Sequence, residues 1–317
     1  MSPVPVDPGM LEFYEELSRH SPPESAQWPL DRQRKAWDDV CRLFRAPRPE
    51  RLIVEDLNAG GVHVRVFRPP GNAPKPGVIY FHGGGWVLGS CETHDDVCAE
   101  IADRADVVVV VVDYRLAPEH PHPAQLADSH SVLDWMRTAG RAMGIDPTHI
   151  IGAGDSAGGQ MTVGLALSLR DRGLPQLRGQ VLIYPVLGAD AETDSYTRNA
   201  HAPCLTRDEM NFYLESFLGP RGGRNWTDPY AVPNLAADFS GLPPAFITVA
   251  EHDPLCDDGV IFHGKLKEAG IGTQLRREPA LAHSYMRARH VSKPAMEGFN
   301  AIIEAIHLLA HEGMLPD

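Results

Sequence analysis

The stretch IIGAGDSAGGQ, residues 150–160, surrounds one serine with four glycines and two alanines. The apolar residues that open it have the composition of a short buried strand, and residues 157–172 carry apolar side chains at helical spacing. Ser156 is therefore expected on a sharp turn from a strand into a helix. Gly154 and Gly158 fit such a turn, because Cβ atoms there would collide with the neighbouring strand and helix. A serine presented in this way is typical of a nucleophile.

The composition is that of a globular protein, and it excludes several classes of partner. Of the 317 residues, 43% are hydrophobic and 22% are charged, which allows a substantial core. The net charge is −13 and no basic run offsets it, so neither nucleic acid nor an anionic membrane surface is an expected partner. The longest apolar run, residues 107–112, has the length of a strand and is too short to span a membrane.

The N-terminus and the cysteines indicate the cytoplasm. Residues 1–20 contain acids and prolines where a signal peptide needs a basic start and an apolar core. The five cysteines are odd in number and have no C-x-x-C spacing, so we expect reduced thiols that bind no metal and form no disulfide.

Strands and helices are expected to alternate along most of the chain, which predicts an α/β fold with a mostly parallel sheet and helices on both of its faces. Two segments, about 1–48 and 188–226, do not follow this alternation. We expect residues 1–317 to form a single domain, with these two segments as a cap over one end of the sheet. The expected strands are 51–57, 62–68, 77–81, a valine strand that ends at Asp113, 149–153, 179–184, 245–250 and 272–277, and the expected helices lie within 9–45 and near 93–104, 124–139, 157–172, 206–218, 257–269 and 294–312.

A serine hydroxyl needs a base to accept its proton and an acid to orient that base. Ligands of parallel sheets collect at the carboxyl ends of the strands, so both partners are expected just beyond strands. Asp253 follows the strand 245–250, and His283 follows the last strand. Glu251 is the alternative acid, whereas Asp155 lies inside the turn and is expected to make local hydrogen bonds. We therefore expect Ser156, His283 and Asp253 to act together.

A run of glycines supplies candidate donors for a developing negative charge. The sequence His82-Gly83-Gly84-Gly85-Trp86 follows the strand 77–81, and three consecutive glycines let backbone N–H groups approach a ligand without hindrance. A plain glycine turn would have the same composition. Beside a serine turn, an acid and a histidine, we interpret the run as part of an oxyanion hole.

Together these features resemble the hormone-sensitive-lipase-like esterases of the α/β-hydrolase superfamily, over nearly the whole chain. The motifs that carry the resemblance are HGGGW at 82–86, DYRLAPEHPHPA at 113–124, GDSAGG at 154–159, DPL at 253–255 and the late His283, with the serine, acid and histidine in the family's order.

The resemblance implies an eight-stranded, mostly parallel sheet whose cap is built from the N-terminal helices and from the insertion after the sixth strand. It also implies an oxyanion hole made by Gly84, Gly85 and the N–H of Ala157, no metal or cofactor, and a homodimer.

Three sites, with four residues in all, differ from the commonest motifs of the family. Ser284-Tyr285 stands where Gly-Phe is usual, Trp86 where Phe is frequent, and Gln160 where Asn is frequent. Because Trp86 and Tyr285 flank the expected reactive groups in the sequence, both are expected beside the substrate pocket.

The sequence thus predicts a cytoplasmic carboxylesterase that hydrolyses small-molecule esters with short to medium acyl chains through an acyl-enzyme. An amidase or arylformamidase is the nearest alternative, because the same groups cleave an activated amide. A ligand-binding protein on the same scaffold is a further alternative, although such proteins lose members of the triad and this chain retains all three.

Overall fold

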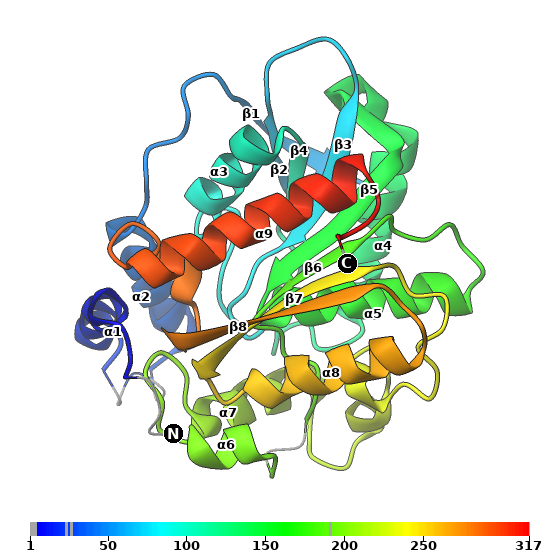
Figure 1. Cartoon of the computed structure of the whole chain (residues 1–317). Coiled ribbons are helices and arrows are strands. Elements are labelled where there is room, and N and C mark those ends of the chain that lie inside the picture. The colour runs from blue at the N-terminus through cyan, green and yellow to red at the C-terminus, as the bar shows by residue number, and fades with distance from the viewer. Residues whose placement is uncertain (1–4, 23–24, 26–27, 190–191, 317) are drawn as a thin grey trace.

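The computed structural model describes residues 5–22, 25, 28–189 and 192–316. Its centre is one eight-stranded sheet in the order β1-β2-β4-β3-β5-β6-β7-β8, as expected (Figure 1). All neighbouring strands from β4 to β8 are parallel, and only β2 runs against its neighbours. The strands are β1 (Ile53–Ala59), β2 (Val62–Arg68), β3 (Lys75–Phe81), β4 (Val108–Val112), β5 (Ile145–Asp155), β6 (Gln180–Ile183), β7 (Ala245–His252) and β8 (Thr273–Ala282).

Helices cover both faces of this sheet. The α-helices are α1 (Pro8–His20), α2 (Leu30–Leu43), α3 (Asp95–Ala105), α4 (Ala124–Thr138), α5 (Ala157–Asp171), α6 (Asp194–Arg198), α7 (Arg207–Leu218), α8 (Cys256–Glu268) and α9 (Lys293–His311). The valine strand β4 shows why two layers form, because alternate valines point to opposite faces. Val109 and Val111 pack in the same core as α3 and α9, whereas Val108, Val110 and Val112 pack with α4, α5 and α8. Figure 1 shows α3 and α9 crossing the sheet in front.

The segments outside the alternation gather at the carboxyl ends of the last strands. In Figure 1, α1, α2, α6 and α7 lie at the end toward which the arrowheads of β7 and β8 point. Side-chain caps mark where two of these helices begin. The Asp7 carboxylate accepts the N–H of Gly9 at 3.0 Å at the start of α1, and Thr206 and Glu209 form a reciprocal capping box at the start of α7.

Two details of this region differ from the sequence-based expectation. The single helical stretch expected within residues 9–45 is two helices, with Pro22 and Pro29 between them, because proline interrupts a helix. The short helix α6 was not expected, since five residues carry too little periodicity to detect. Within the described residues no helix combines the length and the apolar character that crossing a membrane requires.

Candidate active site

Ser156 lies on the turn between β5 and α5 with φ 54° and ψ −117°, a backbone conformation that residues other than glycine rarely adopt. The backbone is packed too tightly for any residue but glycine at the positions two before and two after Ser156. A Cβ at position 158 would lie 1.8 Å from the carbonyl oxygen of Phe81, and one at position 154 would lie 2.5 Å from the carbonyl of Gly158. The N–H of Ser156 donates to Ile183 O at 2.8 Å, which ties the turn to β6.

The structure brings Ser156, His283 and Asp253 into one hydrogen-bonded chain. Ser156 Oγ lies 3.0 Å from His283 Nε2, and His283 Nδ1 lies 2.6 Å from Asp253 Oδ2. The second carboxylate oxygen of Asp253 accepts the N–H of Leu255 at 2.9 Å. The serine is 6% exposed, the histidine 5% and the aspartate 0%. This arrangement can pass a proton from the hydroxyl to the imidazole while the buried carboxylate stabilises the cation that forms.

The two other acids near the site have different partners. Glu251, the alternative acid, forms an ion pair with Arg277 at 2.9 Å, and both side chains are partly exposed to solvent. Asp155 was expected to make local hydrogen bonds, but its side-chain partners lie 61 to 75 positions away in the sequence. It accepts the N–H of Gly83 at 3.0 Å and the hydroxyl of Tyr80 at 2.9 Å. Of these acids, Asp253 alone is bonded to the imidazole of His283 in the described residues.

Asp155 joins the serine turn to the glycine run, and sequence reasoning did not find its partners. Besides Gly83 and Tyr80, its carboxylate lies 3.2 Å from Nε2 of the buried His94. Burial alone would raise the pKa of Asp155, but His94, Arg287 and the Tyr80 hydroxyl lower it to about 2. The carboxylate is therefore charged at neutral pH and holds the first glycine of the run against the turn. No local sequence pattern marks His94 or Tyr80 for this contact.

The glycine run adopts backbone conformations that only glycine tolerates well. Gly84 has φ 124° and Gly85 has φ 59°, and a Cβ on Gly84 would lie 2.3 Å from the carbonyl oxygen of Leu88. The carbonyl of Gly84 accepts the N–H groups of Val87 and Leu88, at 3.1 and 2.8 Å, which closes the loop on itself. Ala157 begins α5, where a helix leaves its first N–H groups without an intrahelical partner. The three positions expected to form the oxyanion hole thus lie on two elements, the glycine loop and the start of α5.

Neither aromatic residue that was expected beside the pocket has exposed surface. Trp86 is 0% exposed, stacks on Phe217 with 4.0 Å between ring centroids, and donates its indole N–H to Gln160 at 2.9 Å. Its φ of 60° belongs to the left-handed region, which is unusual for a bulky residue. Trp86 therefore packs into the core at the end of the glycine run and anchors it there.

Tyr285 is also 0% exposed and donates its hydroxyl to Thr248 at 3.0 Å, within the core under α9. The ring of Tyr184 links it to the histidine, because it meets the rings of both Tyr285 and His283 edge to face, at 5.1 and 4.9 Å between centroids. These contacts make Tyr285 part of the packing that supports the imidazole.

A cavity of about 480 Å³ lies between α1, α2 and α7. Its walls combine apolar and aromatic residues (Tyr14, Trp37, Leu88, Leu205, Phe212 and Tyr213) with polar ones, among them Asp208 and Glu209. It borders the glycine run, because Leu88 ends that loop and the Tyr213 ring lies against Gly85, where a Cβ would come within 2.4 Å of the ring. Of the aromatic residues at the N-terminus, Tyr14 lines the cavity, whereas Phe13 packs against Phe44.

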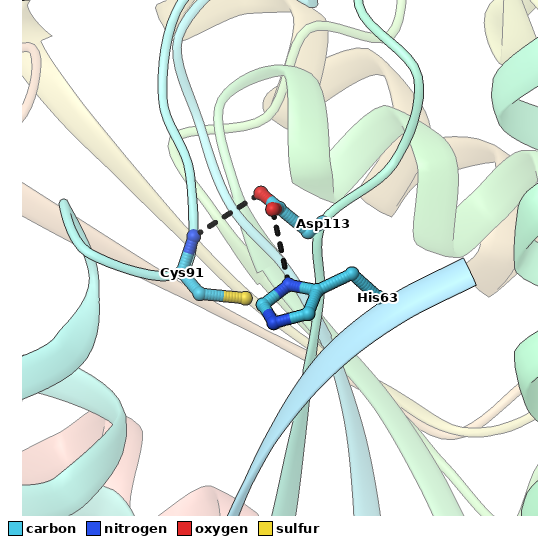
Figure 2. A group of neighbouring side chains, drawn as sticks. All are labelled: His63, Cys91 and Asp113. Carbon is cyan, nitrogen blue, oxygen red and sulfur yellow. Dashed lines mark hydrogen bonds and ion pairs between the residues drawn. The ribbon is translucent and has the colours of Figure 1, made fainter. Parts of the chain in front are cut away.

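One group of side chains in the described part of the chain could be grouped around a metal ion, namely His63, Cys91 and Asp113 (Figure 2). Their ligand atoms lie within 4.8 Å of one another. Each already has a partner, since His63 Nδ1 lies 3.1 Å from Asp113 Oδ2 and the Cys91 thiol donates to Val111 O at 3.6 Å. Burial raises the pKa of the Cys91 thiol, and metals bind the thiolate. We therefore assign no metal to this group.

Comparison with known proteins agrees with the geometry. The family model described as alpha/beta hydrolase fold matches residues 78–287. Carboxylesterase NlhH of Mycobacterium tuberculosis is 43% identical over 285 residues, which cover 84% of this chain and 88% of that protein. Ethyl acetate hydrolase of Pseudomonas putida is 32% identical over 285 residues, with coverage of 87% and 89%.

A solved structure gives the same result at the level of the fold. The structure of an esterase from the bacterial hormone-sensitive lipase family matches with a TM-score of 0.86 and 27% identity, and covers 97% of this chain and 100% of that one. The residues that the family model matches include Ser156, Asp253 and His283. The chain therefore belongs to the α/β-hydrolase family, within its hormone-sensitive-lipase-like branch of carboxylic ester hydrolases.

Proposed function

We propose that this protein is a carboxylesterase in which Ser156 is the nucleophile, His283 the general base and Asp253 the orienting acid. The observation that carries the proposal is the unbroken chain from Ser156 Oγ through the imidazole to the Asp253 carboxylate, with bonds of 3.0 and 2.6 Å. The similarity to carboxylesterase NlhH supports esters over amides or formamides as the substrate class.

In the first half of the reaction, Ser156 Oγ attacks the ester carbonyl and His283 Nε2 takes the hydroxyl proton. The carbonyl oxygen gains a negative charge, which the N–H groups of Gly84, Gly85 and Ala157 stabilise. The tetrahedral intermediate then breaks its bond to the alcohol oxygen, and His283 returns the proton to that leaving group. The acyl group remains on the serine.

In the second half, a water molecule gives a proton to His283 and attacks the acyl carbonyl. The second tetrahedral intermediate collapses, the acid leaves, and the imidazole returns the proton to Ser156 Oγ. Asp253 accepts the Nδ1–H of the imidazole throughout and keeps Nε2 directed at the serine.

A comparison of substrates tests the proposal against its nearest alternative. We expect p-nitrophenyl acetate to be hydrolysed with a much larger kcat/KM than N-formylkynurenine, because the relatives named above are esterases. Purified protein should be assayed with both compounds under the same conditions. A preference for the formamide would move the assignment to an arylformamidase.

Acidification should lower kcat/KM. His283 accepts the serine proton only while its Nε2 carries none, so the fraction of competent enzyme falls as the imidazole becomes protonated. The measurement is kcat/KM for p-nitrophenyl acetate from pH 8 to pH 5 at constant ionic strength, with circular dichroism at each pH as a control for unfolding. A profile that stays flat over this range in folded protein would contradict a histidine base.

We further propose that residues 1–48 and 188–226 form a cap and that the 480 Å³ cavity between the helices of this cap holds the acyl chain. Each methylene that fits an apolar pocket contributes about 0.8 kcal/mol, and a chain that reaches the wall must displace packed side chains at a cost of about 1–3 kcal/mol. The name of the ethyl acetate hydrolase is consistent with a short acyl group.

On this basis kcat/KM for p-nitrophenyl esters should rise from C2, reach a maximum between about C4 and C8, and collapse by about C12 to C16. The substitution Tyr213→Ala removes part of the wall beside the glycine run, so the maximum should move to longer chains. Tyr230→Ala makes the same change outside this cavity and should leave the profile as it is. Efficient C16 hydrolysis by the wild type would exclude a closed pocket.

Two further expectations remain proposals. All five cysteines are free thiols and four of them are buried, which supports a reducing compartment such as the cytoplasm.

The family resemblance also leads us to propose a homodimer, and sedimentation analysis of the purified protein would test it.

A further inference from the structure

The segment that carries Asp253 is held only partly by the sheet. We call residues 251–258, which run from the last two residues of β7 to the first three of α8, the acid loop. The register between β7 and β8 shifts between Ala250 and His252, so Glu251 does not continue the regular ladder. The backbone carbonyls of the acid loop therefore need partners from elsewhere, because buried carbonyls are rarely left without one.

The partners come from the insertion, residues 188–226. The Asn199 side-chain amide donates to Glu251 O and to Asp253 O, both at 2.9 Å. Asn199 is 7% exposed and directly follows α6, where its backbone N–H donates to Ser195 O. One amide group thus bonds the backbone of the acid itself and the backbone two residues before it.

A second set of contacts reinforces the first. Ser195 Oγ donates to Pro254 O at 2.6 Å and accepts the N–H of Asp257 at 3.1 Å, while the N–H of Ser195 donates to the Asp257 carboxylate at 2.8 Å. The Asp258 carboxylate accepts the N–H groups of residues 187 and 188, where the insertion begins, at 2.9 and 2.8 Å. Both the start of the insertion and its helix α6 are bonded to the acid loop.

We propose that Asn199 is a positioning residue, and that through it the insertion sets the place of the Asp253 carboxylate relative to His283. The proposal rests on the function proposed above. Both carboxylate oxygens of Asp253 are engaged, one with the imidazole at 2.6 Å and one with the N–H of Leu255. The side chain therefore has no freedom to compensate for a moved backbone, and a displacement of about 1 Å can cost about 100-fold in rate.

The test begins with Asn199→Ala, which removes both donors. We expect kcat for p-nitrophenyl acetate to fall about 10- to 100-fold, with a smaller change in KM. The matched control is Asn225→Ala. Asn225 lies in the same insertion and its amide also donates to two carbonyls, but these belong to His122 and Leu218, outside the acid loop. Asn225→Ala should retain the wild-type kcat.

A double-mutant cycle separates positioning from general stability. If Asn199 acts through the Asp253 carboxylate, Asn199→Ala should change kcat by less than about 2-fold in an Asp253→Asn background. A residue that only stabilises the fold would cause the same loss in both backgrounds. The low-field proton resonance of the imidazole Nδ1–H should also weaken or shift in Asn199→Ala at a temperature where the variant is folded.

The outcomes are distinct. If Asn199→Ala is too unstable to assay, Asn199→Asp keeps the size of the side chain but replaces the donor amide with an acceptor, so the same loss of kcat is expected. Wild-type kcat in a folded Asn199 variant, or a loss undiminished in the Asp253→Asn background, would overturn the proposal. Full activity in Ser156→Ala would instead overturn the proposed function.

Discussion

Ser156→Ala should lower kcat by about 10⁴-fold or more, as removal of the nucleophile does in serine hydrolases with a triad. Without Oγ no acyl-enzyme forms, and the remaining donors and the pocket can only assist direct attack by water. The fold should be retained, because the φ of 54° is strained for either residue and, among the residues that the structure describes, the hydroxyl is bonded to His283 alone.

The labelling experiment gives the assignment a second, independent measurement. Intact mass after treatment with a fluorophosphonate should show one adduct on the wild type and none on Ser156→Ala. Ser168→Ala is a matched control, because Ser168 Oγ also lies within hydrogen-bond distance of a histidine, 2.9 Å from His130 Nε2, but has no glycine run beside it. That variant should keep both the adduct and the activity. An adduct that persists on Ser156→Ala would assign the nucleophile to another residue.

Asp253→Asn should lower kcat by about 10⁴-fold while leaving the packing intact. The carboxylate accepts the Nδ1–H of His283 over 2.6 Å, which leaves Nε2 free to take the serine proton. An amide nitrogen in its place would favour the proton on Nε2, and the imidazole could then no longer act as a base toward Ser156.

Glu251→Gln is the control for this substitution, since it makes the same chemical change two residues away. The Glu251 carboxylate pairs with Arg277 at the surface, where an ion pair contributes at most about 1 kcal/mol. The loss of kcat in Glu251→Gln should therefore be far smaller than in Asp253→Asn. If the two losses were reversed, Glu251 would be the orienting acid.

The arrangement of the reactive groups could be anticipated because it follows from rules of topology. Alternating strands and helices predict a parallel sheet, and a parallel sheet places the ends of β5, β7 and β8 at one edge. Ser156, Asp253 and His283 each follow one of these strands, so their proximity needs no knowledge of side-chain packing. The glycines at 154 and 158 were likewise predictable, because a sharp turn between packed elements excludes a Cβ.

The side-chain contacts around the site could not be predicted in this way, because they depend on packing between distant segments. Trp86 and Tyr285 flank the reactive groups in the sequence, yet the φ of 60° at Trp86 and the fit of Tyr285 beneath α9 turn both rings into the core. The bond from Asn199 to the carbonyl of Asp253 joins residues 54 positions apart. No local periodicity or cap signal encodes such a contact.

The spacing of the reactive groups along the chain has a consequence for biosynthesis. The serine and the histidine that contacts it are 127 residues apart, and β8 at the edge of the sheet carries the histidine. A ribosome therefore completes the serine turn long before His283 is added, and β8 must pair with β7 before Nε2 can reach the hydroxyl. On the mechanism proposed above, nascent chains and fragments that end before residue 283 lack the base for the serine and should have no esterase activity.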